Sequence, residues 1–134
     1  MKAIEWDDSL SVHIPEIDDQ HKRLIDLIND LDETMAGQDQ PKVHAVIEGL
    51  KDYTIVHFEC EESLLAKNDY PQLKSHQLEH WEFVKKVGNF DQGQSLGLPN
   101  VREGIIRFLT QWLIKHIRGT DHKYAVFLKK KQAS

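Results

Sequence analysis

The chain has 134 residues, a length that fits one domain around a single hydrophobic core. Hydrophobic residues make up 40% of it and charged residues 29%; the net charge is −5 and no basic stripe is present, so we expect no nucleic-acid partner. We find no signal peptide and no run near the roughly 18 apolar residues of a membrane span. We therefore expect one soluble, cytoplasmic domain over residues 1–134 with no membrane partner. The single cysteine, Cys60, excludes an intrachain disulfide.

The first element predicted is an N-terminal arm over residues 1–17, where apolar residues occur without a helical period. A first helix is expected over about residues 18–37. Asp18 or Asp19 can cap its start, and Gly37 is a stop signal. Its apolar stripe has helical spacing and includes a histidine. The stripe consists of His21, Leu24, Ile25, Ile28, Leu31 and Met35.

A second helix is expected over about residues 41–67, with Pro41 in its first turn and Asp39 or Gln40 before it. Its apolar face leads to His57 and Glu61, which are four residues apart and therefore share one side of the helix. Burying such a pair costs free energy unless both groups find partners.

A third helix is expected over about residues 71–88 and carries a second pair at the same spacing, His76 and His80. The glycine-containing stretch 88–99 is predicted to be a loop. A fourth helix follows over about residues 100–118, with His116 on its apolar face, and then a short C-terminal helix. These elements predict an all-α, up-down-up-down four-helix bundle.

Asp121 completes the set of candidate ligands but does not fit a regular helix. Five residues of α-helix turn through about 500°, which leaves Asp121 about 140° from His116. We expect the helix to break between them at Gly119, since glycine is the residue that tolerates such a break best.

Five histidines and two carboxylates on inward faces indicate a metal site. Zinc prefers about four ligands, and calcium and magnesium prefer oxygen, whereas imidazole with carboxylate suits iron, manganese or copper. With a bridging oxide or hydroxide, this set fills about eleven of the roughly twelve positions of two octahedral metals. One open position and mostly neutral ligands favour reversible dioxygen binding over oxygen activation.

Four segments carry a resemblance to a known family. In order they contain His21, His57 with Glu61, His76 with His80, and His116 running on to Asp121. The chain resembles a bacterial hemerythrin over nearly its full length. The matching segments are Ile17-Asp18-Asp19-Gln20-His21-Lys22, His57-Phe58-Glu59-Cys60-Glu61-Glu62, His76-Gln77-Leu78-Glu79-His80 and Trp112-Leu113-Ile114-Lys115-His116-Ile117.

The resemblance implies a role for each ligand. One iron ion (Fe2+/Fe3+) is held by His76, His80 and His116, and the other by His21 and His57 with a position open for dioxygen. The two irons are bridged by Glu61, Asp121 and an oxo or hydroxo group. Tyr53 and Tyr124 stand at family-like positions without a clear role. Apolar residues are expected to form the oxygen pocket, and they are Leu24, Ile25, Ile28, Trp112 and Leu113.

One departure from the family pattern is His13, which stands where relatives commonly have glycine. Histidine tolerates the left-handed region better than most residues, so we expect the fold to be retained. Among the other candidates, we expect His44 and His122 to face solvent and Cys60 to be a packing residue. Glu62 is a candidate partner for a ligand histidine.

The predicted function is therefore dioxygen storage, transport or delivery, without enzymatic turnover. One alternative is a di-iron peroxidase or oxidase, which requires a proton donor that the apolar pocket argues against. Another is an oxygen or redox sensor acting through a separate partner protein. Iron storage is weaker, because only one two-metal site can be read.

Overall fold

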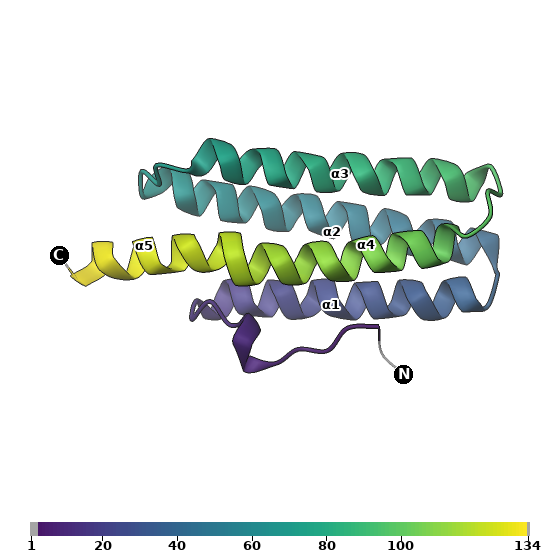
Figure 1. Cartoon of the computed structure of the whole chain (residues 1–134), viewed down its shortest axis with the longest axis horizontal. Coiled ribbons are helices and arrows are strands. Elements are labelled where there is room, and N and C mark those ends of the chain that lie inside the picture. Colours follow the sequence, from purple (N-terminus) through teal and green to yellow (C-terminus); the bar gives the residue numbers. More distant parts are fainter. Residues whose placement is uncertain (1–2, 134) are drawn as a thin grey trace.

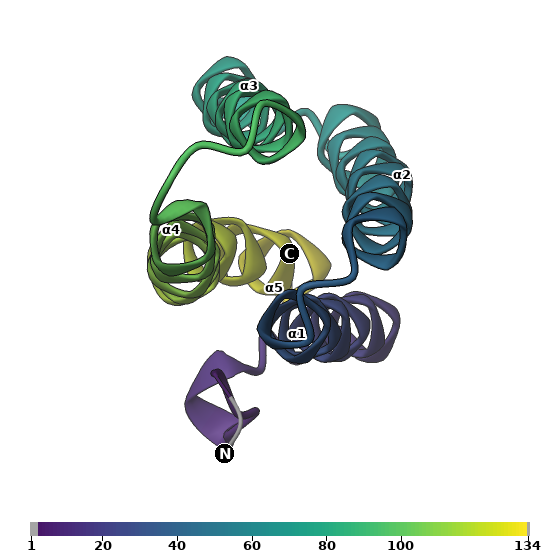
Figure 2. The same ribbon diagram turned by 90° about the vertical axis from the view of Figure 1, so that its right-hand side faces the viewer.

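Four long antiparallel helices form the body of the molecule, as a computed structural model of the chain shows over residues 3–133. The helices are α1 (Pro15–Ala36), α2 (Gln40–Lys67), α3 (Leu73–Ser95) and α4 (Val101–Lys115). Viewed from the end, they stand at the corners of a four-sided bundle (Figure 2). The all-α, up-down-up-down prediction is confirmed, and the described residues contain no β-strand.

The fourth helix does not end where the sequence predicts. α4 passes directly into a π-helical turn, η2 (His116–Asp121), and this turn passes into α5 (His122–Ala133). The three elements form one continuous rod along the bundle, coloured green to yellow in Figure 1. The C-terminal helix is thus an extension of α4.

The N-terminal arm packs along the outside of the bundle beside α1 (Figures 1 and 2). It contains one short 3-10 turn, η1 (Asp8–Leu10), and it buries Ile4 and Val12 in the main core. The side chain of Asn29 in α1 holds it further, since its Nδ2 donates to the Ile4 carbonyl oxygen at 2.9 Å.

The first helix begins at Pro15, three residues earlier than predicted, because proline is well suited to the first turn of a helix. The carboxylate of Asp18 therefore does not cap the helix. It accepts hydrogen bonds from the Val12 backbone N–H at 2.8 Å and from the Ser11 hydroxyl at 2.6 Å. The start of α2 follows the prediction, with Asp39 accepting from the Lys42 backbone N–H.

The third helix continues to Ser95, through the stretch predicted to be a loop. Phe90 packs against the core and Gly93 is buried, so tertiary packing outweighs the low helix propensity of glycine. The helix stops before Gly97, which has a φ of +70°, and the Leu98 N–H returns to the Gly93 carbonyl at 3.0 Å.

The interior of the bundle changes character along its length. One half is apolar and fully buried, with residues such as Leu31, Ile47, Leu50 and Leu109. In the other half, the same inward faces carry histidines and carboxylates. No helix in the described part of the chain is both long enough and apolar enough to cross a membrane.

Candidate metal centre

All seven predicted ligand side chains meet in the polar half of the bundle. Helix α1 contributes one of them, while α2, α3 and the turn η2 contribute two each. Each residue is at most 3% exposed. They are His21, His57, Glu61, His76, His80, His116 and Asp121.

The π-helical turn is what places Asp121 in this cluster. Backbone hydrogen bonds in a π-helix join residues five apart, so η2 brings Asp121 onto the same side as His116. The predicted break at Gly119 is wrong, because the helix stays continuous through it. Gly119 has no positive φ, and a Cβ added there would meet nothing within 4 Å.

The carboxylate of Glu61 faces histidines through both of its oxygens. Its Oε1 lies 2.6 Å from His76 Nε2, 3.0 Å from His80 Nε2 and 3.8 Å from His116 Nε2. Its Oε2 lies 3.5 Å from His57 Nε2 and 3.6 Å from His21 Nε2. One oxygen thus serves three histidines and the other serves two.

Asp121 divides its oxygens in the same way. Its Oδ1 lies 3.0 Å from His116 Nε2 and 3.3 Å from His76 Nε2, whereas its Oδ2 lies 3.2 Å from His21 Nε2. The cluster therefore has two halves, each facing one oxygen of both carboxylates. We call them the three-histidine group (His76, His80, His116) and the two-histidine group (His21, His57).

Three of the histidines have a polar partner on the outer side of the ring. The Nδ1 of His80 lies 2.8 Å from Glu62, that of His116 lies 3.1 Å from Glu79, and that of His57 is paired with Gln20. Each partner presents an oxygen to Nδ1, which favours a proton there and leaves Nε2 free to bind a metal.

Of these partners the sequence indicated only Glu62. Gln20 and Glu79 each lie next to a ligand histidine in the chain but off its apolar stripe, and their contacts cross between helices. The one available signal was their polar character beside His21 and His80, which is common on solvated faces.

Aromatic side chains hold two of the rings in place. Phe58 stacks on His80 with centroids 3.7 Å apart and planes inclined by 4°, and Trp112 stacks on His116 at 4.3 Å and 13°. The buried hydroxyl of Tyr124, from α5, donates to Glu61 Oε2 at 2.9 Å. The sequence did not assign these roles to Phe58 and Tyr124.

Charges within the cluster are balanced by protons when no metal is bound. Burial lowers the pKa of His21, but Asp121 and Glu61 outweigh it and raise that pKa to about 9. The pKa of His116 is raised for the same reasons, while burial lowers the pKa of His57 to about 4. Burial also raises the pKa of Glu61 and Asp121, yet the facing imidazoles bring both below their ordinary values. Bound cations can replace these protons.

The donors fit a pair of metal ions. Both oxygens of Asp121 and the Nε2 atoms of His21 and His116 are buried without a well-formed hydrogen bond to any residue in 3–133. Such atoms are costly to bury unless something else satisfies them. Two fully buried sets of donors meet the geometric requirement for a metal ion, and Glu61 belongs to both. The sets are His76, His80 and His116 with Glu61, and His21 and His57 with Glu61.

The predicted oxygen-pocket residues lie in the same core. Trp112 is half-buried and stacks on His116. The other four predicted pocket residues are at most 4% exposed, and they are Leu24, Ile25, Ile28 and Leu113. The part of these five residues in binding dioxygen stays a prediction.

Three histidines were not predicted to be metal ligands, and the structure places each of them differently. His44 is exposed, with Nδ1 3.6 Å from Asp91, as predicted. His122 is half-buried rather than purely superficial, because its ring nitrogens lie 2.8 Å from the backbone oxygens of Ser11 and Arg118. His13 has a φ of 59°, so it adopts the left-handed conformation for which glycine is suited.

Comparison with known proteins agrees with this geometry. Residues 12–128 match the family described as Hemerythrin HHE cation binding domain. A bacteriohemerythrin of Stenotrophomonas maltophilia is 34% identical over 125 residues, covering 93% of this chain and 81% of that protein. A hemerythrin-like protein of Naegleria gruberi is 36% identical over 119 residues, covering 89% of this chain and 88% of that protein.

The fold gives the same answer independently of these sequence matches. The crystal structure of a wild-type hemerythrin superimposes with a TM-score of 0.84 at 28% identity, covering 91% of this chain and 95% of that one. With the sequence match spanning most of its length and the bundle superimposing over nearly all of it, the chain belongs to the hemerythrin family.

Proposed function

We propose that this protein binds two iron ions at the seven clustered residues and binds dioxygen reversibly there, for storage, transport or delivery. Membership of the hemerythrin family and the bundle fold support a di-iron, oxygen-binding domain. The names of its relatives as bacteriohemerythrins point the same way.

The observation that carries the proposal is the division of the Glu61 and Asp121 oxygens between the two histidine groups. A carboxylate that offers one oxygen to each of two donor sets is placed to bridge two metals. In both Glu61 and Asp121, one oxygen faces the three-histidine group and the other faces the two-histidine group. A single metal would not need donors arranged in two halves.

The two halves differ in donor number, which leaves room for an outside ligand. The three-histidine group offers three nitrogens and two carboxylate oxygens, whereas the two-histidine group offers one nitrogen fewer. Because iron favours six ligands, an iron ion held by His21 and His57 would be left with more room for dioxygen than one held by His76, His80 and His116.

The surrounding residues favour binding over turnover. Iron, when bound, supplies the electrons that reversible dioxygen binding requires. Around it, the chain excludes water by burying all seven ligands, and the expected pocket residues are apolar. Tyr124 places a buried hydroxyl against Glu61, but burial raises the pKa of this hydroxyl far above the ordinary value and it already donates to that carboxylate. It is therefore a poor proton donor for peroxide chemistry.

An anaerobic optical titration of the reduced, iron-loaded protein with dioxygen tests this proposal. Absorption bands that appear with dioxygen and disappear on argon flushing are expected. Immediate conversion to a stable di-ferric form, with peroxide released or consumed, would contradict reversible binding.

Two alanine variants serve as matched controls for the titration. His57→Ala removes a buried ligand and is expected to abolish the reversible bands. His44→Ala removes an exposed histidine from the same helix and is expected to leave them unchanged.

A further inference from the structure

The partners on the outer sides of the histidine rings are unevenly charged. In the three-histidine group, His80 and His116 each face a carboxylate, from Glu62 and Glu79 respectively. In the two-histidine group, His57 faces the neutral amide of Gln20. Two negative charges thus support one half of the cluster.

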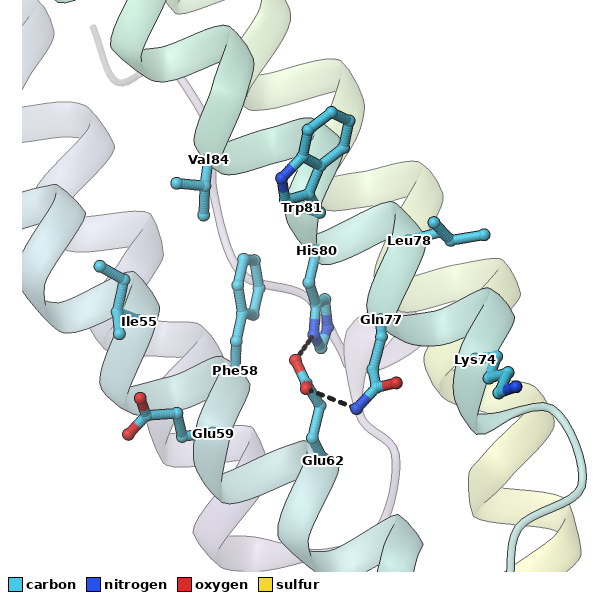
Figure 3. A pocket seen from close by; sticks show the side chains of 10 residues that line it. All are labelled: Ile55, Phe58, Glu59, Glu62, Lys74, Gln77, Leu78, His80, Trp81 and Val84. Carbon is cyan, nitrogen blue, oxygen red and sulfur yellow. Dashed lines mark hydrogen bonds and ion pairs between the residues drawn. The ribbon is translucent and has the colours of Figure 1, made fainter.

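Each carboxylate is itself held in position by a neighbouring side chain. The Thr120 hydroxyl lies 2.8 and 2.9 Å from the two oxygens of Glu79, so the turn η2 fixes the partner of its own histidine. Gln77 Nε2 donates to Glu62 Oε1 at 3.1 Å. Figure 3 shows Glu62 reaching from α2 to both His80 and Gln77 of α3.

The neutral partner is held in position as well. Its Oε1 faces the His57 ring, while its Nε2 lies 3.5 Å from the sulfur of Cys60, one turn along the same side of α2. A carboxylate substituted for Gln20 would lose that donor but keep an oxygen facing His57.

The charge of such a partner changes what the ligand ring offers to a metal. A carboxylate that accepts the Nδ1 proton makes imidazole a stronger donor through Nε2, and a neutral amide does so less. Stronger imidazole donors and nearby negative charge both stabilise Fe3+ more than Fe2+, because Fe3+ carries the higher positive charge. The two metal positions should then differ in how easily they are oxidised.

We propose that Glu62 and Glu79 are positioning residues that make the three-histidine position the first to be oxidised, and that Gln20 keeps the two-histidine position ferrous. The inference rests on the two-iron part of the proposed function. It adds a reason for the asymmetry that a dioxygen-binding position needs, since dioxygen binds to ferrous iron.

The test compares charge-changing variants of nearly equal size in the iron-loaded protein. Glu62→Gln and Glu79→Gln each remove one negative partner, and Gln20→Glu adds one to the other half. Glu59→Gln is the matched control, because Glu59 is exposed on α2 one turn from Glu62 and its side chain points away from His80 (Figure 3).

Two measurements are made, and neither uses dioxygen. Protein loaded with 57Fe is oxidised by one equivalent of ferricyanide and its Mössbauer spectrum is recorded. The reduction potentials of the two successive one-electron oxidations of the iron pair are then determined. We expect a localised Fe3+ signal in the unsubstituted protein. The first step should move to higher potential in Glu62→Gln and Glu79→Gln, and the two steps should lie closer together in Gln20→Glu.

Iron affinity gives a third readout, since loss of such a partner typically weakens metal binding by about 10- to 100-fold. The inference is overturned if the variants at Glu62 and Glu79 shift the potentials no more than Glu59→Gln does. If the protein holds both irons but fails the dioxygen titration described for the proposed function, only the proposed reversible binding is contradicted. A protein that takes up no iron would contradict both.

Discussion

His116 Nε2 lies 3.0 Å from Asp121 Oδ1, although a regular α-helix would separate these two side chains by more than a third of a turn. The π-helical turn between them closes that angle without breaking the helix. The ligand set thus depends on a local change of helical pitch, and Tyr124 reaches Glu61 from the helix that follows the same turn.

Gly119→Ala tests whether that turn needs its glycine. Because Gly119 has no positive φ and open space at its Cβ, alanine should raise stability by up to about 1 kcal/mol and the melting temperature by a few degrees. Thermal unfolding followed by circular dichroism measures this. Gly104→Ala is the contrasting variant, since its Cβ would lie 2.9 Å from Phe90 and should cancel the gain. A large loss of stability in Gly119→Ala would show that the glycine is required.

Metal removal should destabilise the fold. Seven buried polar side chains lose their common partner when the cluster is stripped by a chelator, so binding free energy is also folding free energy. Free iron at a thousand times its dissociation constant would stabilise the native state by about 4 kcal/mol. Urea unfolding with and without chelator measures the difference. Equal unfolding midpoints would contradict a buried metal site.

The metal-free protein should lose stability as the pH rises from 6.5 to about 9. The pKa of His21 is near 6.5 in the unfolded chain and about 9 in the fold, so the folded state holds an extra proton in this interval. The stabilisation is fully present below pH 6.5 and is lost as the pH rises through 9; it is on the order of 3 kcal/mol.

Urea unfolding of the metal-free protein at pH 6, 7.5 and 9 tests this pH dependence. The iron-loaded protein is the control, because a metal on Nε2 keeps the ring of His21 neutral at all three values. A metal-free protein whose stability stayed level over this interval would rule out the protonated cluster.

Tyr124→Phe isolates one hydrogen bond to a bridging carboxylate. The hydroxyl donates to the fully buried Glu61 at 2.9 Å, and a hydrogen bond to a charged group contributes about 1.5–3 kcal/mol. We expect the variant to bind two irons but to unfold at lower denaturant concentration. Iron content and urea unfolding are measured together. Tyr53→Phe, also an aromatic of the core but half-buried on α2, is the comparison and should change stability less.

The ligands on regular helices were predictable because helical spacing is local. His57 with Glu61, and His76 with His80, share a face by virtue of their four-residue separation. The same periodicity, read along the whole chain, determined the bundle.

The end of the third helix was not predictable by this route, because local glycine content and tertiary packing disagree there. Gly88 suggested a stop, whereas the burial of Gly93 and the packing of Phe90 keep α3 helical to Ser95. Glycine costs a helix about 1 kcal/mol relative to alanine. This cost is small beside the free energy gained when such packing buries apolar surface.

By itself, then, the sequence determined which inward faces carry nitrogen and oxygen donors, since that follows from residue spacing alone. Only the tertiary structure decided how Asp121 rejoins His116, because a π-helical turn leaves no clear periodic signal. It also decided that Glu79 and Gln20 support ligand histidines, because their contacts cross between helices that are distant in the chain.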